Sequence, residues 1–174
     1  MLMPSPTNFR VQNLTVFAMF TAAALSLSAF ENLIPSPVAG IKLGLANIII
    51  LFVLLCFGYK EAMLINISRC LLASVFGGGI SSLIYSLTGA IASLSFMYLL
   101  ILASKGRLST VCISICGALI HILVQLYVAS VITGSMYVFE LIPIYMVTSV
   151  ISGLFVGVAC WFLTGFYNKF NKNT

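Results

Sequence analysis

Long uncharged stretches, separated by short clusters of charge, divide the chain into apolar segments. The stretches without Asp, Glu, Lys or Arg are residues 11–30, 43–59, 70–104, 108–139 and 141–168. A helix that crosses a membrane needs about 20 mainly apolar residues. Residues 77–79 are all glycine, which predicts a turn and divides the third stretch between two helices. The pattern therefore predicts six helices, at about 11–30, 42–58, 61–77, 80–104, 108–133 and 139–166.

Composition places these helices in a lipid bilayer. Of the 174 residues, 61% are hydrophobic and 6% are charged, and the mean hydropathy is +1.19. Soluble domains usually have about 25% charged residues. We therefore expect an all-α polytopic membrane protein with six transmembrane helices, in which residues 1–174 form a single integral membrane domain.

The positive charges predict the orientation of these helices. Six spans put both termini on one side of the membrane, together with the loops after the second and fourth spans. That side contains Arg10, Lys60, Lys105, Arg107, Lys169 and Lys172. The other side contains Lys42, beside Glu31 and Glu140. Because cytoplasmic loops are enriched in Lys and Arg, both termini are predicted to be cytoplasmic. The net charge of +5 then reflects these loops, and no nucleic-acid partner is expected.

The acidic residues argue against several kinds of catalysis. The chain has three Glu and no Asp, and the Glu residues lie far apart in the sequence. Prenyl-chain synthases hold Mg²⁺ and diphosphate with Asp-rich motifs, because hard cations prefer clustered oxygen ligands. The phosphate-binding loop G-x-x-x-x-G-K-[ST] of ATPases is also missing. We therefore expect no enzymatic activity, no metal site and no cofactor bound by this chain, and we interpret the five Cys as packing residues.

Polar residues gather in the outer half of the predicted bundle, and ionisable residues inside a membrane usually mark functional sites. Arg69 lies near the middle of the membrane, and His121 and Gln125 share one face of the fifth helix. The inner half is almost purely apolar, which is typical of a pocket that is open to the outside and closed below. The candidate substrate-binding residues are Glu31, Lys42, Asn47, Arg69, His121, Gln125 and Glu140.

Structural alternatives exist for these residues. Arg69 could pair with Glu31 or Glu140 to neutralise its charge, and His121 with Gln125 could join neighbouring helices. Lys42 could extend to lipid headgroups. The segment 31–44, which contains two prolines, could be a lid over the pocket or a tight connection between helices.

Small residues at four-residue spacing allow close helix packing at two places. Ala18, Ala22 and Ser26 form one such seam on the first helix, and Gly153 and Gly157 form another on the sixth.

The sequence from Glu31 to Asn47 contains Glu-x-x-Ile-Pro followed by Gly-Ile-Lys-Leu-Gly-Leu-Ala-Asn. It resembles the bacterial family called heptaprenyl diphosphate synthase component I, also known as the Gx transporter family. The resemblance covers nearly the whole chain and continues through residues 60–62, 69–79 and 117–125. Where the family usually has Asn and Gly, this chain has Ile122 and Val124.

This family is in turn similar to the S components of energy-coupling factor (ECF) transporters. That similarity implies six helices, cytoplasmic termini and an outer ligand pocket covered by the first loop. It also implies that Ala18, Ala22 and Ser26 contact a separate transmembrane coupling subunit, and that a pair of ATPase subunits drives transport.

The leading hypothesis is a substrate-binding subunit of an ECF-type importer in the bacterial cell membrane. It would capture a small anionic or amphipathic vitamin, quinone precursor or isoprenoid-related solute from outside. Lys42 and Arg69 would pair with a carboxylate or phosphate of this ligand, while apolar walls hold the rest. One alternative is a non-catalytic membrane subunit associated with heptaprenyl diphosphate or menaquinone biosynthesis. Another is a solitary secondary transporter, which the lack of a convincing internal repeat disfavours.

Overall fold

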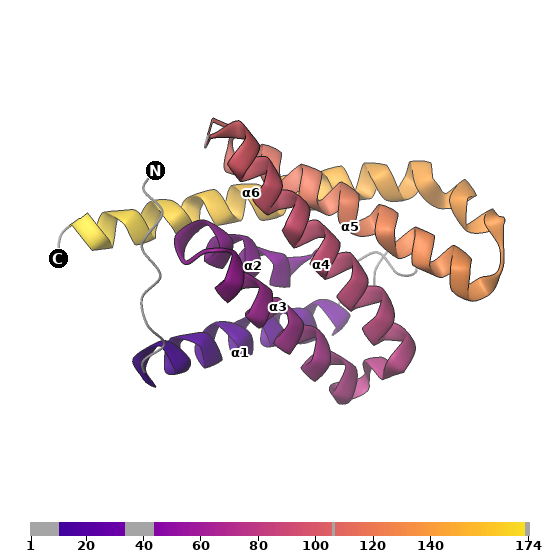
Figure 1. The fold of residues 1–174 in the computed structure, drawn as a ribbon, viewed down its shortest axis with the longest axis horizontal. Helices are drawn as coiled ribbons and strands as arrows, with labels where there is room; N and C mark the ends of the chain where they lie inside the picture. The colour runs from indigo at the N-terminus through magenta and orange to yellow at the C-terminus, as the bar shows by residue number, and fades with distance from the viewer. Residues whose placement is uncertain (1–10, 34–43, 106, 173–174) are drawn as a thin grey trace.

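The computed structural model describes residues 11–33, 44–105 and 107–172, and within these ranges the secondary structure is entirely helical (Figure 1). The α-helices are α1 (Val11–Leu33), α2 (Leu45–Cys56), α3 (Tyr59–Ala73), α4 (Gly79–Ser104), α5 (Thr110–Thr133) and α6 (Ile142–Lys172). A π-helical turn, η1 (Ser74–Gly78), joins α3 to α4, and a 3-10 helix, η2 (Met136–Leu141), precedes α6. The all-helical class and the six predicted helices are confirmed.

The start of the sixth helix differs from the prediction for a local reason. The sixth helix was expected from residue 139, but η2 occupies that position and α6 begins at Ile142, directly before Pro143. Proline is tolerated in the first turn of a helix because its missing N–H has no intrahelical partner there. The predicted glycine turn is confirmed, since Gly79 has a φ of +66°, which L side chains rarely adopt.

Three segments are long and apolar enough to cross a membrane, judged by length and composition: α4, α5 and Met136–Phe170. Two shorter apolar helical segments are Thr15–Glu31 and Leu45–Cys56. Large apolar side chains such as Val75, Met136 and Phe170 are exposed, which is normal for a surface that contacts lipid and unfavourable for one that contacts water. The six-span topology and the cytoplasmic termini remain predictions.

The second helix occupies the centre of the bundle. Figure 1 shows α2 between α1 and α6, and its residues Ile50, Leu51 and Val53 are almost completely buried. An aromatic cluster of Phe20, Phe52, Phe57 and Tyr167 packs at its C-terminal end, with ring centroids 5.6 to 6.4 Å apart. This packing fills the end of the bundle where α6 terminates.

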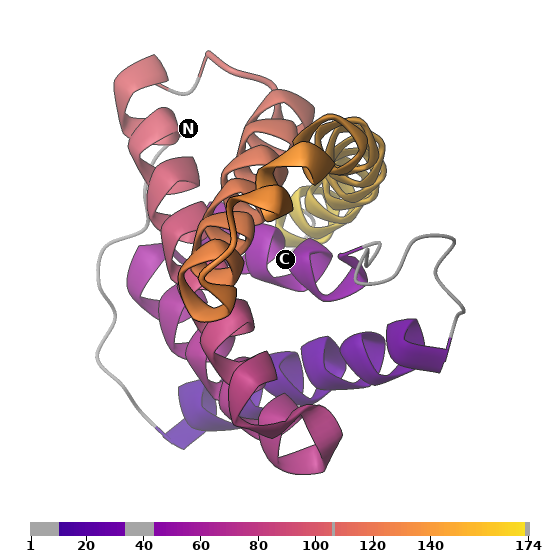
Figure 2. The same cartoon turned by 90° about the vertical axis from the view of Figure 1, so that its right-hand side faces the viewer.

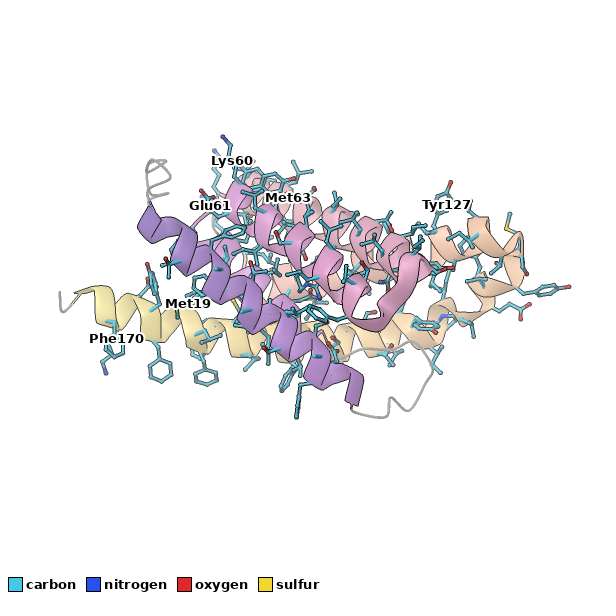
Figure 3. The ribbon with its side chains drawn as sticks, turned by 90° about the horizontal axis from the view of Figure 1, so that it is seen from below. Met19, Lys60, Glu61, Met63, Tyr127 and Phe170 are labelled. Carbon is cyan, nitrogen blue, oxygen red and sulfur yellow. The ribbon has the colours of Figure 1, made fainter. Side chains whose placement is uncertain are left out.

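Basic side chains lie at that same end. Figure 3 shows Lys60 and Glu61 pointing away from the bundle near the end of α6 marked by Phe170, whereas Tyr127 lies toward the opposite end. Lys105 and Lys169, at the ends of α4 and α6, are exposed as well. The described Lys60, Lys105 and Lys169 therefore lie toward one end of the bundle, while Arg10 and Lys42, which the orientation prediction also used, lie outside the described residues.

The predicted glycine seam on the sixth helix is confirmed. A Cβ atom at Gly153 would lie 2.7 Å from the Cα of Ile115, and one at Gly157 would lie 2.6 Å from the Cα of Val111. Only a residue without a Cβ allows this approach. The seam joins α6 to α5, and this pair makes the most extensive helix contact of the described chain.

Candidate functional site

All six helices contribute to a cavity of about 1180 Å³ at the end of the bundle opposite the aromatic cluster. This volume exceeds the roughly 300–1,000 Å³ that is usual for small-molecule sites. The cavity brings together residues that are far apart in the sequence. The predicted site residues that line it are Glu31, Asn47, Arg69, His121 and Gln125.

Two predicted residues are not part of this described lining. Glu140 is exposed on η2, which precedes α6, and it is not among the described residues that line the cavity. Lys42 lies outside the described residues, as does most of the 31–44 segment that was predicted to be a lid or a tight connection.

Glu31 connects the end of α1 to the start of α2. Its carboxylate is buried and accepts a hydrogen bond from the backbone N–H of Gly44 through Oε1. Gly44 has a φ of +73° as the N-cap residue of α2, and a Cβ there would lie 3.1 Å from Nδ2 of Asn47. A negative charge near a helix N-terminus is favourable because the helix dipole is positive there. Glu31 therefore fixes the corner that carries Asn47 into the cavity.

Arg69 is the buried cation of the cavity wall, with 8% of its surface exposed. Its Nη2 donates to Oδ1 of Asn66 at 3.2 Å and to Sγ of Cys70 at 3.7 Å. Its Nε atom is buried and has no hydrogen-bond partner. Within the described part of the chain, no carboxylate lies within ion-pair distance of Arg69, so the pairing with Glu31 or Glu140 that could neutralise it is not observed.

Asn66 holds the guanidinium in place, and the sequence analysis did not identify it. Its Nδ2 donates to the backbone carbonyl of Ala90 on α4 at 3.2 Å, while its Oδ1 accepts from Arg69. The available signal was its position three residues before Arg69, which puts both side chains on one face of α3.

His121 and Gln125 face α4 from α5, as their spacing predicted. A Cβ at Gly89 of α4 would lie 3.1 Å from Nε2 of His121 and 3.0 Å from Cγ of Gln125. The side-chain amide of Gln125 donates to the carbonyl of Tyr85 at 3.4 Å. These two residues therefore both line the cavity and join neighbouring helices, which combines the two interpretations offered for them.

A row of hydroxyl groups on α6 forms another part of the wall, which the sequence analysis also missed. Tyr145, Thr148, Ser149 and Ser152 line the cavity and lie on one face of the helix. Thr148 donates to the carbonyl of Ile144 at 3.1 Å, and Ser149 donates to that of Tyr145 at 2.7 Å. Because their protons bond to their own helix, these hydroxyls present acceptor oxygens to the cavity.

The proposed partner seam is accessible. Ala18, Ala22 and Ser26 are all exposed on α1, and Ser26 also lines the cavity. Among the described residues, no group of three or more His, Cys, Asp or Glu side chains is placed to hold a metal ion. All five cysteines are free, and Cys70 and Cys160 are buried.

Comparison with known proteins identifies a family. The sequence model described as heptaprenyl diphosphate synthase component I matches residues 20–163, which include every described lining residue of the cavity. No curated protein and no solved structure matches the chain. The match covers most of the chain, and three of its helical segments are long and apolar enough to cross a membrane. The chain therefore belongs to the heptaprenyl diphosphate synthase component I family, and it is a membrane protein.

Proposed function

We propose that this chain is the substrate-binding subunit of an importer of the ECF type, and that its cavity receives a small anionic or amphipathic solute from outside the cell. The observation that carries the proposal is Arg69, a buried cation in the wall of a large cavity without a carboxylate partner in the described chain. Buried charges are unfavourable unless they are paired. A ligand anion would supply the missing partner.

The wall around Arg69 suits recognition of such a ligand. Asn66 accepts a hydrogen bond from Nη2 and so orients the guanidinium, and we assign the donation to a ligand phosphate or carboxylate to Nη1, for which the described residues provide no hydrogen bond. His121, Gln125 and Asn47 provide further polar groups of the cavity lining. The sequence adds Lys42 as a second candidate cation, two residues before Gly44. Binding and release require no covalent step.

Uptake against a gradient requires energy from other subunits, because the chain has no phosphate-binding loop. We place the contact with a transmembrane coupling subunit on Ala18, Ala22 and Ser26, which are exposed and small enough for close approach by another helix. A pair of ATPases would act through that subunit.

The family description favours a second candidate, a non-catalytic membrane subunit in heptaprenyl diphosphate synthesis. The two candidates predict different partners. An importer subunit associates with a membrane coupling protein and ATPases, whereas a synthase component associates with a soluble Asp-rich synthase.

Affinity purification from native membranes in mild detergent, followed by mass spectrometry, distinguishes these candidates. We expect a coupling subunit and ATPases to co-purify, and we expect Ala22→Trp to abolish their recovery. The matched control is Val16→Trp, an exposed position outside the seam on the same helix. Recovery of a synthase subunit would favour the second candidate, and recovery of neither would contradict the importer proposal.

A further inference from the structure

The cavity opens along the side of α1 as well as near the end of that helix. Ser26 and Ala29 both line the cavity and are exposed, so they border its opening. They lie seven and four residues before Leu33, which is about 10 and 6 Å along the helix. On α6, the lining residues extend to Ser152, about 15 Å from the start of that helix.

Helix packing does not close this side of the described bundle. α1 packs extensively against α2 and α3, and the described residues show no comparable contact between α1 and α5 or α6. Figure 2 shows α1 apart from α6, with α2 lying between these two helices. The cavity occupies this region, because residues of both α1 and α6 line it.

The surface around the opening is apolar, although the cavity wall is polar. Phe76 of η1, which lines the cavity, is 76% exposed, and Phe30 of α1 is 57% exposed. On α6, Val147 and Ile151 are 62% and 61% exposed, and each directly precedes a hydroxyl residue of the cavity wall. Side chains of this kind contact lipid in a membrane protein. The opening therefore lies at a boundary between hydrocarbon and a polar cavity.

We propose that the ligand of this site is an amphipathic anion. Its charged head lies against Arg69, and its hydrocarbon chain leaves the cavity between α1 and α6 toward the surrounding lipid. This inference rests on the proposed function, because it assumes that the cavity is the ligand site. A compact hydrophilic anion would satisfy Arg69 and leave the polar wall open to hydrocarbon, whereas a chain with an anionic head matches both environments.

A series of phosphates with different chains tests this ligand class. The full chain in lipid nanodiscs is titrated with inorganic phosphate, butyl phosphate and octyl phosphate by calorimetry, and the heat measured with empty nanodiscs is subtracted. Each methylene withdrawn from water strengthens binding roughly fourfold, so four methylenes allow up to about 200-fold. We expect octyl phosphate to bind at least tenfold more tightly than butyl phosphate, and Arg69→Gln to weaken the binding of both at least tenfold.

Variants at the opening test the path of the ligand's hydrocarbon chain. We expect Ala29→Trp to weaken the binding of octyl phosphate at least tenfold and to change the affinity for butyl phosphate by less than about twofold. Met19→Trp is the matched control, because Met19 is exposed on the same helix and does not line the cavity (Figure 3). Ser26→Trp replaces Ala29→Trp if the latter does not yield folded protein, as judged by gel filtration.

The possible outcomes separate this inference from the proposed function. Equal affinity for the three phosphates, lost in Arg69→Gln, would overturn the amphipathic ligand and leave an anion-binding subunit. Octyl phosphate binding that neither Arg69→Gln nor Ala29→Trp changes would place the probe on the lipid surface and overturn the inference. If none of the phosphates binds, both the ligand class and the anion site are wrong.

Discussion

Replacing Arg69 with Gln separates a ligand-binding role from a structural one, because the two roles predict different changes. Arg69 has an unpartnered buried Nε and no ion-pair partner in the described residues, so its charge does not stabilise the empty protein through a carboxylate. Gln retains a side-chain amide that can donate to Asn66. We therefore expect the free energy of unfolding of the ligand-free protein to rise or to change by less than about 1 kcal/mol.

Ligand affinity is expected to fall in the same variant. A hydrogen bond to a charged group contributes about 1.5–3 kcal/mol, and 1.4 kcal/mol corresponds to a tenfold change. Loss of the guanidinium should therefore weaken the binding of octyl phosphate by about 10- to 150-fold. Arg69→Lys keeps the charge without the planar donors and should give an intermediate affinity. Lys60→Gln, at an exposed position near the other end of the bundle, should change neither quantity.

Both quantities are measurable on the same preparations. Calorimetry in nanodiscs gives affinity, and thermal unfolding is followed with a thiol-reactive fluorophore, which reports exposure of the buried Cys70 and Cys160. The reasoning fails if Arg69→Gln lowers the free energy of unfolding by more than about 2 kcal/mol while affinity stays unchanged. That result would make Arg69 a structural residue.

Four further substitutions, one of them a control, test positions of small residues. Gly157→Ala should lower the free energy of unfolding by about 1–3 kcal/mol, because its Cβ would lie 2.6 Å from a backbone atom of α5. The control is Gly165→Ala, whose Cβ would have no neighbour within 4 Å. This control should be neutral or slightly stabilising in thermal unfolding. Gly89→Ala should weaken octyl phosphate severalfold in calorimetry, because it displaces the side chains of His121 and Gln125; unchanged affinity would exclude them from the site. Ala22→Trp should leave octyl phosphate binding unchanged, because Ala22 does not line the cavity, and a loss would mean that Ala22 as well as Ser26 contributes to it.

The positions of the helices were predictable because they depend on local properties. The length of an apolar stretch and the charges at its ends determine where a membrane helix begins and ends, and three consecutive glycines were enough to locate the turn before α4. The start of α6 was not predictable in the same way. Residues 136–141 are apolar except for Glu140 and match a helical pattern, yet they form a 3-10 helix that only the structure distinguishes.

The depth of the candidate site in the membrane was predictable from the sequence, whereas the side-chain contacts within the site were less so. Counting residues from the helix ends placed Asn47 and His121 in the outer half of the bundle and Arg69 near the middle of the membrane, and the structure brings them to one cavity. The roles of Asn66 and Gly89 depend on how α3 and α5 pack against α4. Such contacts between helices are set by tertiary packing, so one sequence read along its length does not contain them.

The proposed preference of the cavity for anions rests on the different surroundings of its two described charged residues, Glu31 and Arg69. The carboxylate of Glu31 receives the N–H of Gly44 at the start of α2, where the helix dipole also stabilises negative charge. Among the described residues, the guanidinium of Arg69 donates to the amide oxygen of Asn66 and the sulfur of Cys70, and neither carries a negative charge that would neutralise it. A cationic ligand would compete with the backbone for Glu31 and would be repelled by Arg69. An anionic ligand would give Arg69 the charged partner that the described residues do not provide, without displacing a carboxylate from it.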